Sequence, residues 1–215
     1  MTRTTEAAIG GRAPPGFLTM PEAPRGLVIF AHGSGSSRLS PRNRFAAEYL
    51  LRLEFSSLLF DLLTEDEARD RRNVFDIPLL GARMVEAIDW ARADERTFPL
   101  PIGLFGASTG AAAAIVAAVE RSAEVAAIVS RGGRPDLAGD ALARLQAPTL
   151  LIVGGEDREV LALNRAAAAR MHCVKALAVV AGATHLFEEE GALEQALAAA
   201  GRWYGEYLRP GPTFP

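Results

Sequence analysis

IGLFGASTGAAAAIVAAV, residues 102–119, joins a short apolar strand to an alanine-rich helix through Gly106-Ala107-Ser108-Thr109-Gly110. A G-x-S-x-G pattern between a strand and a helix is typical of a nucleophilic serine held in a sharp, strained turn. Small residues on either side let the chain turn without collision, and the helix N-terminus beyond supplies free N–H groups near developing negative charge. A tight turn without chemical function is the alternative. The order of strand, turn and helix favours the nucleophile.

Short apolar runs and helical patterns alternate on both sides of this turn. Strands are expected at residues 27–31, 56–60, 101–105, 125–129, 148–153 and 176–180, and helices at 41–53, 79–93, 109–120, 161–171 and 191–208. Because strands separated by helices of this length pair in parallel through right-handed crossovers, the sequence predicts an α/β fold with an open, mostly parallel sheet flanked by helices. Such a sheet places its functional site at the carboxyl ends of its strands.

The ends of the chain and one charged segment depart from this alternation. Ala8-Ile9 and Phe17-Leu18 suggest one or two antiparallel strands within an edge segment, residues 1–25, although nearby prolines argue against strands there. The charged residues 64–72 predict a solvated loop or a short helix, and the Pro- and Gly-rich residues 209–215 predict a frayed tail. A chain of 215 residues is expected to form a single domain, residues 1–215.

Composition and charge narrow the functional classes. The chain is 49% apolar and 23% charged, with a net charge of −3, and this balance argues against a nucleic-acid binder. Cys173 is the only cysteine, which excludes an internal disulfide and a cysteine-based zinc site. The longest apolar run, residues 111–119, is shorter than the ~20 residues of a membrane span, and the N-terminus lacks a secretory pattern. We therefore expect a cytoplasmic protein without nucleic-acid or membrane partners.

A base and an orienting acid for the serine are found after two later strands. Asp157 follows the strand at 148–153, and His185 follows the strand at 176–180. The chain order Ser108, Asp157, His185 is that of a nucleophile, acid and base at one edge of such a sheet. A helix N-cap is the alternative role for Asp157, and a loop histidine bonded to backbone is the alternative for His185. The agreement of all three positions and their order favours the triad.

The loop after the first buried strand supplies a candidate oxyanion hole. His32-Gly33-Ser34-Gly35-Ser36-Ser37 is rich in small residues, which let backbone N–H groups approach a bound acyl group. The N–H of Thr109 is expected to be one donor and that of Ser34 the other, with Gly35 as the next choice. A phosphate-binding loop is the competing reading, but the spacing and the Gly-Lys-Ser/Thr ending of such loops are absent. His32 is expected to border the substrate and to shape the loop.

Two arginines and one acid follow other strands at the same edge. Arg131 and Arg134 come after the strand at 125–129, where two guanidinium groups would suit a carboxylate on the substrate. Their alternative role is that of solvated loop arginines. Asp61 follows the strand at 56–60 and either supports the site or makes an ordinary loop contact.

The motifs together resemble the α/β-hydrolase superfamily, and within it the short, dienelactone-hydrolase-like branch. The resemblance covers roughly residues 25–207. The motifs also look like those of free-standing relatives of a hydrolase domain that is fused to phosphoribosyltransferases in some bacteria. The elbow holds Ser108 where dienelactone hydrolases carry cysteine, and no phosphoribosyltransferase motif is present. The resemblance is carried by His32–Ser37, Phe105–Gly110, Ser130–Asp136, Ile152–Asp157 and Gly182–Phe187.

The expected function is that of a serine hydrolase. It would cleave carboxylic esters or lactones of small substrates through an acyl-enzyme, without a metal or an organic cofactor. Thioesterase, peptidase or perhydrolase activity with the same triad is the alternative, as is a hydrolase-like binding protein with little turnover. Residues 125–150 leave no room for a large helical cap, so we expect an open site and short acyl or lactone substrates. The oligomeric state is expected to be a monomer or a homodimer.

Overall fold

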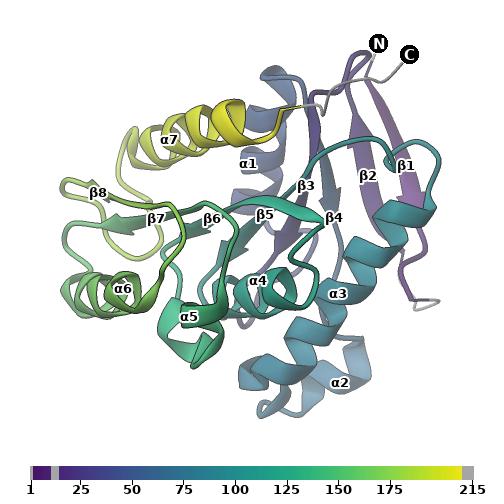
Figure 1. Ribbon diagram of the computed structural model, residues 1–215. Coiled ribbons are helices and arrows are strands. Elements are labelled where there is room, and N and C mark those ends of the chain that lie inside the picture. The colour runs from purple at the N-terminus through teal and green to yellow at the C-terminus, as the bar shows by residue number, and fades with distance from the viewer. Residues whose placement is uncertain (1, 11–14, 210–215) are drawn as a thin grey trace.

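The computed structural model describes residues 2–10 and 15–209 and contains an eight-stranded sheet with helices on both faces (Figure 1). The strand order is β1-β2-β4-β3-β5-β6-β7-β8. The strands are β1 (Arg3–Ala7), β2 (Gly16–Met20), β3 (Gly26–Ala31), β4 (Phe55–Leu59), β5 (Ile102–Ala107), β6 (Val125–Arg131), β7 (Thr149–Gly154) and β8 (Lys175–Val180). Strands β3 to β8 pair in parallel, whereas β1 pairs with β2, and β2 with β4, in antiparallel fashion. The predicted α/β fold with a mostly parallel sheet is confirmed.

Helices cover the two faces of the sheet in separate layers (Figure 1). One layer holds α1 and α7, and the other holds α3, α4, α5 and α6. The longer helices are α1 (Pro41–Arg52), α3 (Ile77–Ala93), α4 (Thr109–Glu120), α6 (Arg158–Arg170) and α7 (Ala192–Tyr207). The shorter ones are α2 (Glu65–Arg69), α5 (Ala141–Arg144) and the 3-10 helices η1 (Asn73–Phe75) and η2 (Pro135–Ala138).

Strand β3 explains why the sequence folds into two layers. Leu27 and Ile29 pack into the core under α3 and α4, whereas Val28 and Phe30 pack into the core under α1 and α7. A strand buried on both faces must be apolar at every position, because neither face meets water. The continuous run at residues 27–31 is the sequence signature of this arrangement.

Small residues let helix α4 pack closely against its neighbours. All four alanines of Ala111–Ala114 are fully buried. A Cβ at Gly81 of α3 would lie only 2.8 Å from Val116 Cγ1 of α4, so the two helices meet at a glycine. Close backbone approach here replaces bulky side chains as the means of filling the interior.

Several details differ from the sequence expectation. The first edge strand covers residues 3–7, just before the predicted Ala8-Ile9, because Arg3–Ala7 pairs in register with the second edge strand. The charged segment 64–72 was expected to be a solvated loop or a short helix, and its residues 65–69 form the short helix α2, whose first turn is fixed by a capping box between Thr64 and Glu67. Helices η1, η2 and α5 were not expected, and residues 210–215 of the predicted frayed tail lie outside the described residues. Among residues 2–10 and 15–209, no helix is long and apolar enough to span a membrane.

Candidate active site

Ser108 lies in the strained turn between β5 and α4. Its backbone has φ of 50° and ψ of −125°, a conformation that residues other than glycine rarely adopt. Gly106 and Gly110 make the turn possible, since a Cβ at these positions would lie 2.4 Å from Ala111 Cα and 2.2 Å from the Ala31 carbonyl oxygen, respectively. The turn presents the serine at the carboxyl end of β5, as the motif predicts.

Asp157 and His185 meet through a hydrogen bond between two neighbouring loops. The Nδ1 atom of His185 lies 2.7 Å from Asp157 Oδ2, and the acid is largely buried while the histidine is more exposed. The loops approach closely at Gly154, where a Cβ would lie 2.3 Å from the Ala183 carbonyl oxygen. With Nδ1 donating to the carboxylate, Nε2 is the ring nitrogen left to accept a proton.

Ser108 and His185 line the same cavity, which we call the serine cavity. It has a volume of about 540 Å³ and is also bordered by residues 33–37, residues 39–43, Arg131 and Gly132. Gly132 has φ of +52° and sits against the histidine, since a Cβ there would lie 3.1 Å from the His185 carbonyl oxygen. The structure therefore brings the predicted nucleophile and base to one solvent-accessible space.

The predicted oxyanion loop packs directly against the serine. A Cβ at Gly33 would lie 2.8 Å from Ser108 Cβ, so only glycine allows this approach. Ser34 borders the serine cavity and also a neighbouring one of about 350 Å³, which we call the side cavity. Thr109 borders the side cavity and begins α4. Both residues predicted to donate to the oxyanion, Ser34 and Thr109, thus lie close to Ser108.

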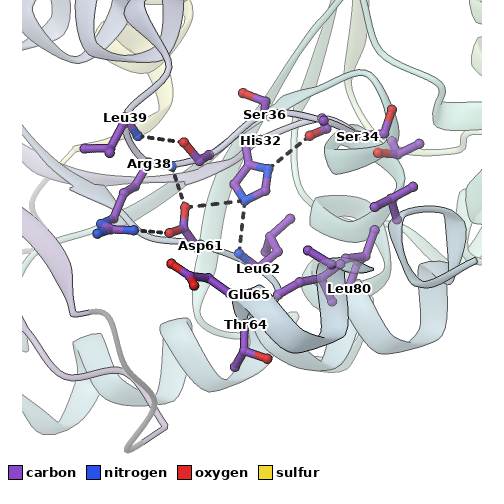
Figure 2. Close-up of a pocket in the computed structure, with 17 residues that line it drawn as sticks. His32, Ser34, Ser36, Arg38, Leu39, Asp61, Leu62, Thr64, Glu65 and Leu80 are labelled. Carbon is purple, nitrogen blue, oxygen red and sulfur yellow. Dashed lines mark hydrogen bonds and ion pairs between the residues drawn. The ribbon is translucent and has the colours of Figure 1, made fainter. Parts of the chain in front are cut away.

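His32 faces the side cavity, where it ties two loops together (Figure 2). Its Nδ1 lies 3.0 Å from the Gly33 carbonyl oxygen, and its Nε2 accepts a hydrogen bond of 3.1 Å from the Leu62 backbone N–H. These contacts fit a neutral ring that carries its proton on Nδ1. Burial lowers the pKa of His32, and its hydrogen bond to Gly33 and the nearby charge of Asp61 partly oppose this shift. The expectation that His32 shapes the loop fits these contacts.

Asp61 fastens the far end of the same loop (Figure 2). Its carboxylate accepts a 2.6 Å hydrogen bond from the Arg38 backbone N–H and forms an ion pair with the Arg38 guanidinium. His32 Nε2 lies 3.9 Å from the same carboxylate. Residues 33–37 are therefore held at both ends, by His32 and by Asp61. Arg38 was not singled out by the sequence, because its partner lies 23 residues away.

Arg131 and Arg134 have different surroundings. Arg131 is 8% exposed and borders the serine cavity, with its guanidinium carbon 6.0 Å from the Phe105 ring centroid and 5.9 Å from that of Phe187. Its Nε is buried and has no hydrogen-bond partner among the described residues. Burial, assisted by the charge of Arg42, lowers the pKa of Arg131 to about 10. Arg134 instead pairs with Asp136 at 2.8 Å and does not border the serine cavity.

Three further residues of the site were missed by the sequence reasoning. Arg42 and Asn43 border the serine cavity from the first turn of α1, and Arg42 pairs with Glu188 near the His185 loop. Asn164 is buried in α6 and donates a 2.9 Å hydrogen bond to the Gly133 carbonyl oxygen, which anchors the loop after Arg131. A polar residue within an alanine-rich helical face was the available signal for Asn164.

The described part of the chain offers no alternative centre based on a metal. Residues 2–10 and 15–209 contain no group of three or more histidine, cysteine or acidic side chains arranged to hold an ion. Cys173 is half-buried away from the serine cavity, and burial is the main cause that raises the pKa of its thiol. A thiol with a raised pKa is a poor nucleophile at neutral pH.

The chain was compared with family models and with curated proteins. No family model matches it. Two Mycobacterium tuberculosis proteins, from strains CDC 1551 and H37Rv, are each 57% identical over 199 residues and are provisionally named phosphoribosyl transferases. The match covers 92% of this chain and 45% of each relative, so the chain spans less than half the length of these relatives.

Solved structures show the fold and the family. A dienelactone hydrolase from Anabaena variabilis has 48% sequence identity and a TM-score of 0.92, with 97% of this chain and 99% of that chain covered. A cold-adapted esterase from an Arctic intertidal metagenomic library has 16% identity and a TM-score of 0.76, covering 97% and 94% of the two chains. A dienelactone hydrolase-like promiscuous phosphotriesterase from metagenomic libraries has 18% identity and a TM-score of 0.77, covering 96% and 98%. The chain therefore belongs to the dienelactone hydrolase family of α/β-hydrolases.

Proposed function

We propose that the protein is a serine hydrolase that cleaves carboxylic esters or lactones of small substrates. The observation that carries this proposal is the 2.7 Å hydrogen bond between His185 Nδ1 and Asp157, with His185 and the strained Ser108 bordering one cavity. A serine hydroxyl needs a base to remove its proton, and the base needs an acid that fixes its tautomer. The arrangement of Ser108, His185 and Asp157 supports the roles of nucleophile, base and orienting acid.

The proposed reaction passes through an acyl-enzyme. Ser108 Oγ bonds to the acyl carbon while His185 Nε2 takes the hydroxyl proton and Asp157 stabilises the resulting imidazolium. The N–H groups of Thr109 and Ser34 stabilise the oxyanion, an effect of about 3 kcal/mol for one donor in comparable sites. The histidine then gives its proton to the departing alcohol, and a water molecule, activated by the same histidine, releases the acid.

Covalent labelling tests this function directly. A fluorophosphonate probe is expected to modify Ser108 in the folded protein, and a chromogenic acetate ester is expected to be hydrolysed. The Ser108→Ala variant should lose both signals, whereas peptide mapping of the wild type should place the adduct on residue 108. Failure of the folded wild type to react with either reagent would support a binding protein with the fold of a hydrolase.

We further propose that Arg131 binds a negatively charged group of the substrate. Its guanidinium is buried at the serine cavity, and no carboxylate in residues 2–10 or 15–209 forms an ion pair with it. A buried cation without a carboxylate partner is costly, and an anionic ligand would offset that cost. Arg134 has Asp136 as its partner and serves as the matched control.

The assay for Arg131 uses two acetate esters that differ only in a carboxylate or a carboxamide on the alcohol. Arg131→Ala is expected to remove the preference for the carboxylate ester and to affect the carboxamide ester little. Arg134→Ala should retain the wild-type preference. Equal hydrolysis of the two esters by the wild type would show that Arg131 is structural.

A further inference from the structure

Two cavities meet at the loop next to Ser108, and the proposed function gives each a different part of the substrate. The serine cavity contains His185, whereas the side cavity contains Thr109 but neither Ser108 nor His185. Residues 33–37 border both spaces. The loop that carries the proposed oxyanion donor Ser34 therefore lies between them.

The tetrahedral intermediate has four substituents, and three of them have proposed positions. One is Ser108 Oγ, the second is the oxyanion at the N–H groups of Thr109 and Ser34, and the third is the oxygen of the departing alcohol. That third oxygen must lie near His185 Nε2, because this atom supplies its proton. The alcohol half is thereby assigned to the serine cavity, and the acyl chain must leave in the remaining direction.

We propose that the side cavity is the acyl subsite of this enzyme, an inference that rests on the proposed serine hydrolase function. Ser34 and Thr109, whose N–H groups flank the oxyanion in the proposed reaction, both border this cavity, so it begins beside the proposed position of the oxyanion. Its volume of about 350 Å³ lies at the lower end of the range for small-molecule sites. The acyl group is therefore a short or medium one.

The lining of the side cavity defines the chemistry of the acyl group. Its walls include Leu62, Leu80, Val74 and other apolar side chains. The charges of Asp61 and Arg38 are paired with each other, and the exposed Glu65 adds a negative charge. An apolar, uncharged chain fits these walls, whereas a carboxylate there would meet Glu65 without a free cation.

The two cavities together specify a class of substrate. Arg131, which has no carboxylate partner among the described residues, borders the serine cavity and not the side cavity, and the alcohol half is assigned to the serine cavity. The preferred substrate is therefore an ester between a small apolar acid and an alcohol that carries a negative charge. An ester with the charge on its acid half would place that charge in the wrong cavity.

A residue on helix α2 can be substituted to test the proposed acyl subsite. Ala68 on α2 borders the side cavity and is exposed, so a larger side chain can enter the space without displacing the core. The helix is held by its capping box and by the ion pair of Glu67 with Arg83 at 2.6 Å. Ala166 of α6 is likewise exposed and borders neither cavity, so it provides the matched control.

The test varies the acyl chain of p-nitrophenyl esters while the alcohol stays constant. Each methylene buried in the subsite should raise kcat/KM roughly fourfold, which corresponds to ~0.8 kcal/mol, so butanoate should exceed acetate by roughly 15-fold in the wild type. Ala68→Trp is expected to lower this butanoate-to-acetate ratio about tenfold. Ala166→Trp should keep the wild-type ratio. Val74→Ala, which enlarges the cavity, should shift the preference towards hexanoate and provides a second test if the tryptophan variant does not fold.

The outcomes separate the subsite from the function. A wild type that hydrolyses esters with a flat dependence on acyl length overturns the acyl subsite alone. The same conclusion follows if Ala68→Trp slows acetate and butanoate equally, or if it changes the preference among alcohols instead. A folded wild type that hydrolyses no ester and does not react at Ser108 overturns the proposed function, and the subsite with it.

Discussion

Asp157 occupies the N-cap position of α6, yet its carboxylate makes no hydrogen bond to the helix N-terminus. It accepts from His185 Nδ1 instead. An aspartate that caps a helix typically contributes ~1 kcal/mol to stability, and this side chain forgoes that contribution. Its orientation towards the imidazole is the residue-scale evidence that favours the triad over a purely structural role.

Triad substitutions should act as a unit rather than additively. Ser108→Ala and His185→Ala are each expected to lower kcat by roughly 10⁴-fold or more, and the double variant should be little worse than either. Asp157→Asn should retain more activity than the two single variants, because the nucleophile and the base remain. Steady-state kinetics on a chromogenic ester check these values. Near-normal turnover by Ser108→Ala would refute the mechanism.

Cys173→Ser supplies the control for the choice of nucleophile. The thiol is half-buried, and burial raises its pKa, so it contributes little thiolate at neutral pH. We expect this variant to keep the wild-type kcat and KM. A large loss of activity, measured with the same ester, would mean that the cysteine and not the serine is the nucleophile.

The turn between β5 and α4 stores strain at the scale of a structural element. A non-glycine residue at φ of 50° and ψ of −125° is typically destabilised by about 1–3 kcal/mol, and the surrounding strand and helix must hold it there. Gly106 and Gly110 permit the close contacts on both sides. The turn is therefore built at the expense of stability in order to present one side chain.

Two substitutions of the same serine separate strain from chemistry. Ser108→Ala removes the hydroxyl but keeps a Cβ in the strained conformation, whereas Ser108→Gly removes both. Both variants should be inactive, and the glycine variant should be more stable than the alanine variant by roughly 1 kcal/mol or more, because glycine adopts this conformation freely. Urea unfolding monitored by circular dichroism measures the difference. A less stable glycine variant would show that the turn is unstrained.

The loop of residues 33–37 depends on a neutral His32. Its Nε2 accepts from the Leu62 N–H, and a protonated ring could not do so. Burial lowers the pKa of His32 below its usual 6.5, so the unfolded chain binds this proton more readily than the folded one. Stability from this group is therefore complete above about pH 6.5 and is lost as the pH falls from there towards the lower pKa of the folded state.

This linkage predicts a pH-dependent difference between two histidine variants. The free energy of unfolding of the wild type should fall between pH 7.5 and pH 5, and His32→Gln should show a smaller fall over the same range. His172→Gln, at an exposed histidine, should follow the wild type. Denaturant titrations at several pH values provide the measurement. Parallel curves for the wild type and His32→Gln would contradict a buried, neutral imidazole.

For the molecule as a whole, the sequence predicted the strands and the residues that follow them better than it predicted the cavities. Strand β3 was predictable because a strand buried on both faces must be apolar throughout. The positions of Ser108, Asp157 and His185 at one edge of the sheet were predictable because each residue follows a strand. The capping box that starts α2 was also present in the sequence as Thr64 and Glu67. These signals are local, and short-range physical chemistry determines them.

The two cavities were not predictable, because tertiary packing alone creates them. The side cavity joins residues near positions 33, 62, 74, 80 and 109, and no local pattern relates these positions. The sequence offered Arg131, and failing it Arg134, as the partner of a substrate carboxylate, yet Arg131 ends β6 and Arg134 pairs with Asp136. Their different surroundings follow from the end of β6 at Arg131, a boundary that a single sequence does not locate to the residue.

The connection between β6 and β7 determines how the enzyme should treat lipid substrates. Residues 132–148 form only η2 and α5, too little chain for a large helical cap over the serine cavity. Activation at a lipid surface requires an apolar lid that opens there, and this connection provides none. We therefore expect hydrolysis of a long-chain triglyceride to be slower than that of a short-chain ester, without a rise in rate when the substrate exceeds its solubility. Titration of tributyrin through its solubility limit, with triolein emulsion as the comparison, tests this expectation. A sharp rise above the limit, or faster turnover of triolein, would mean that another segment covers the site.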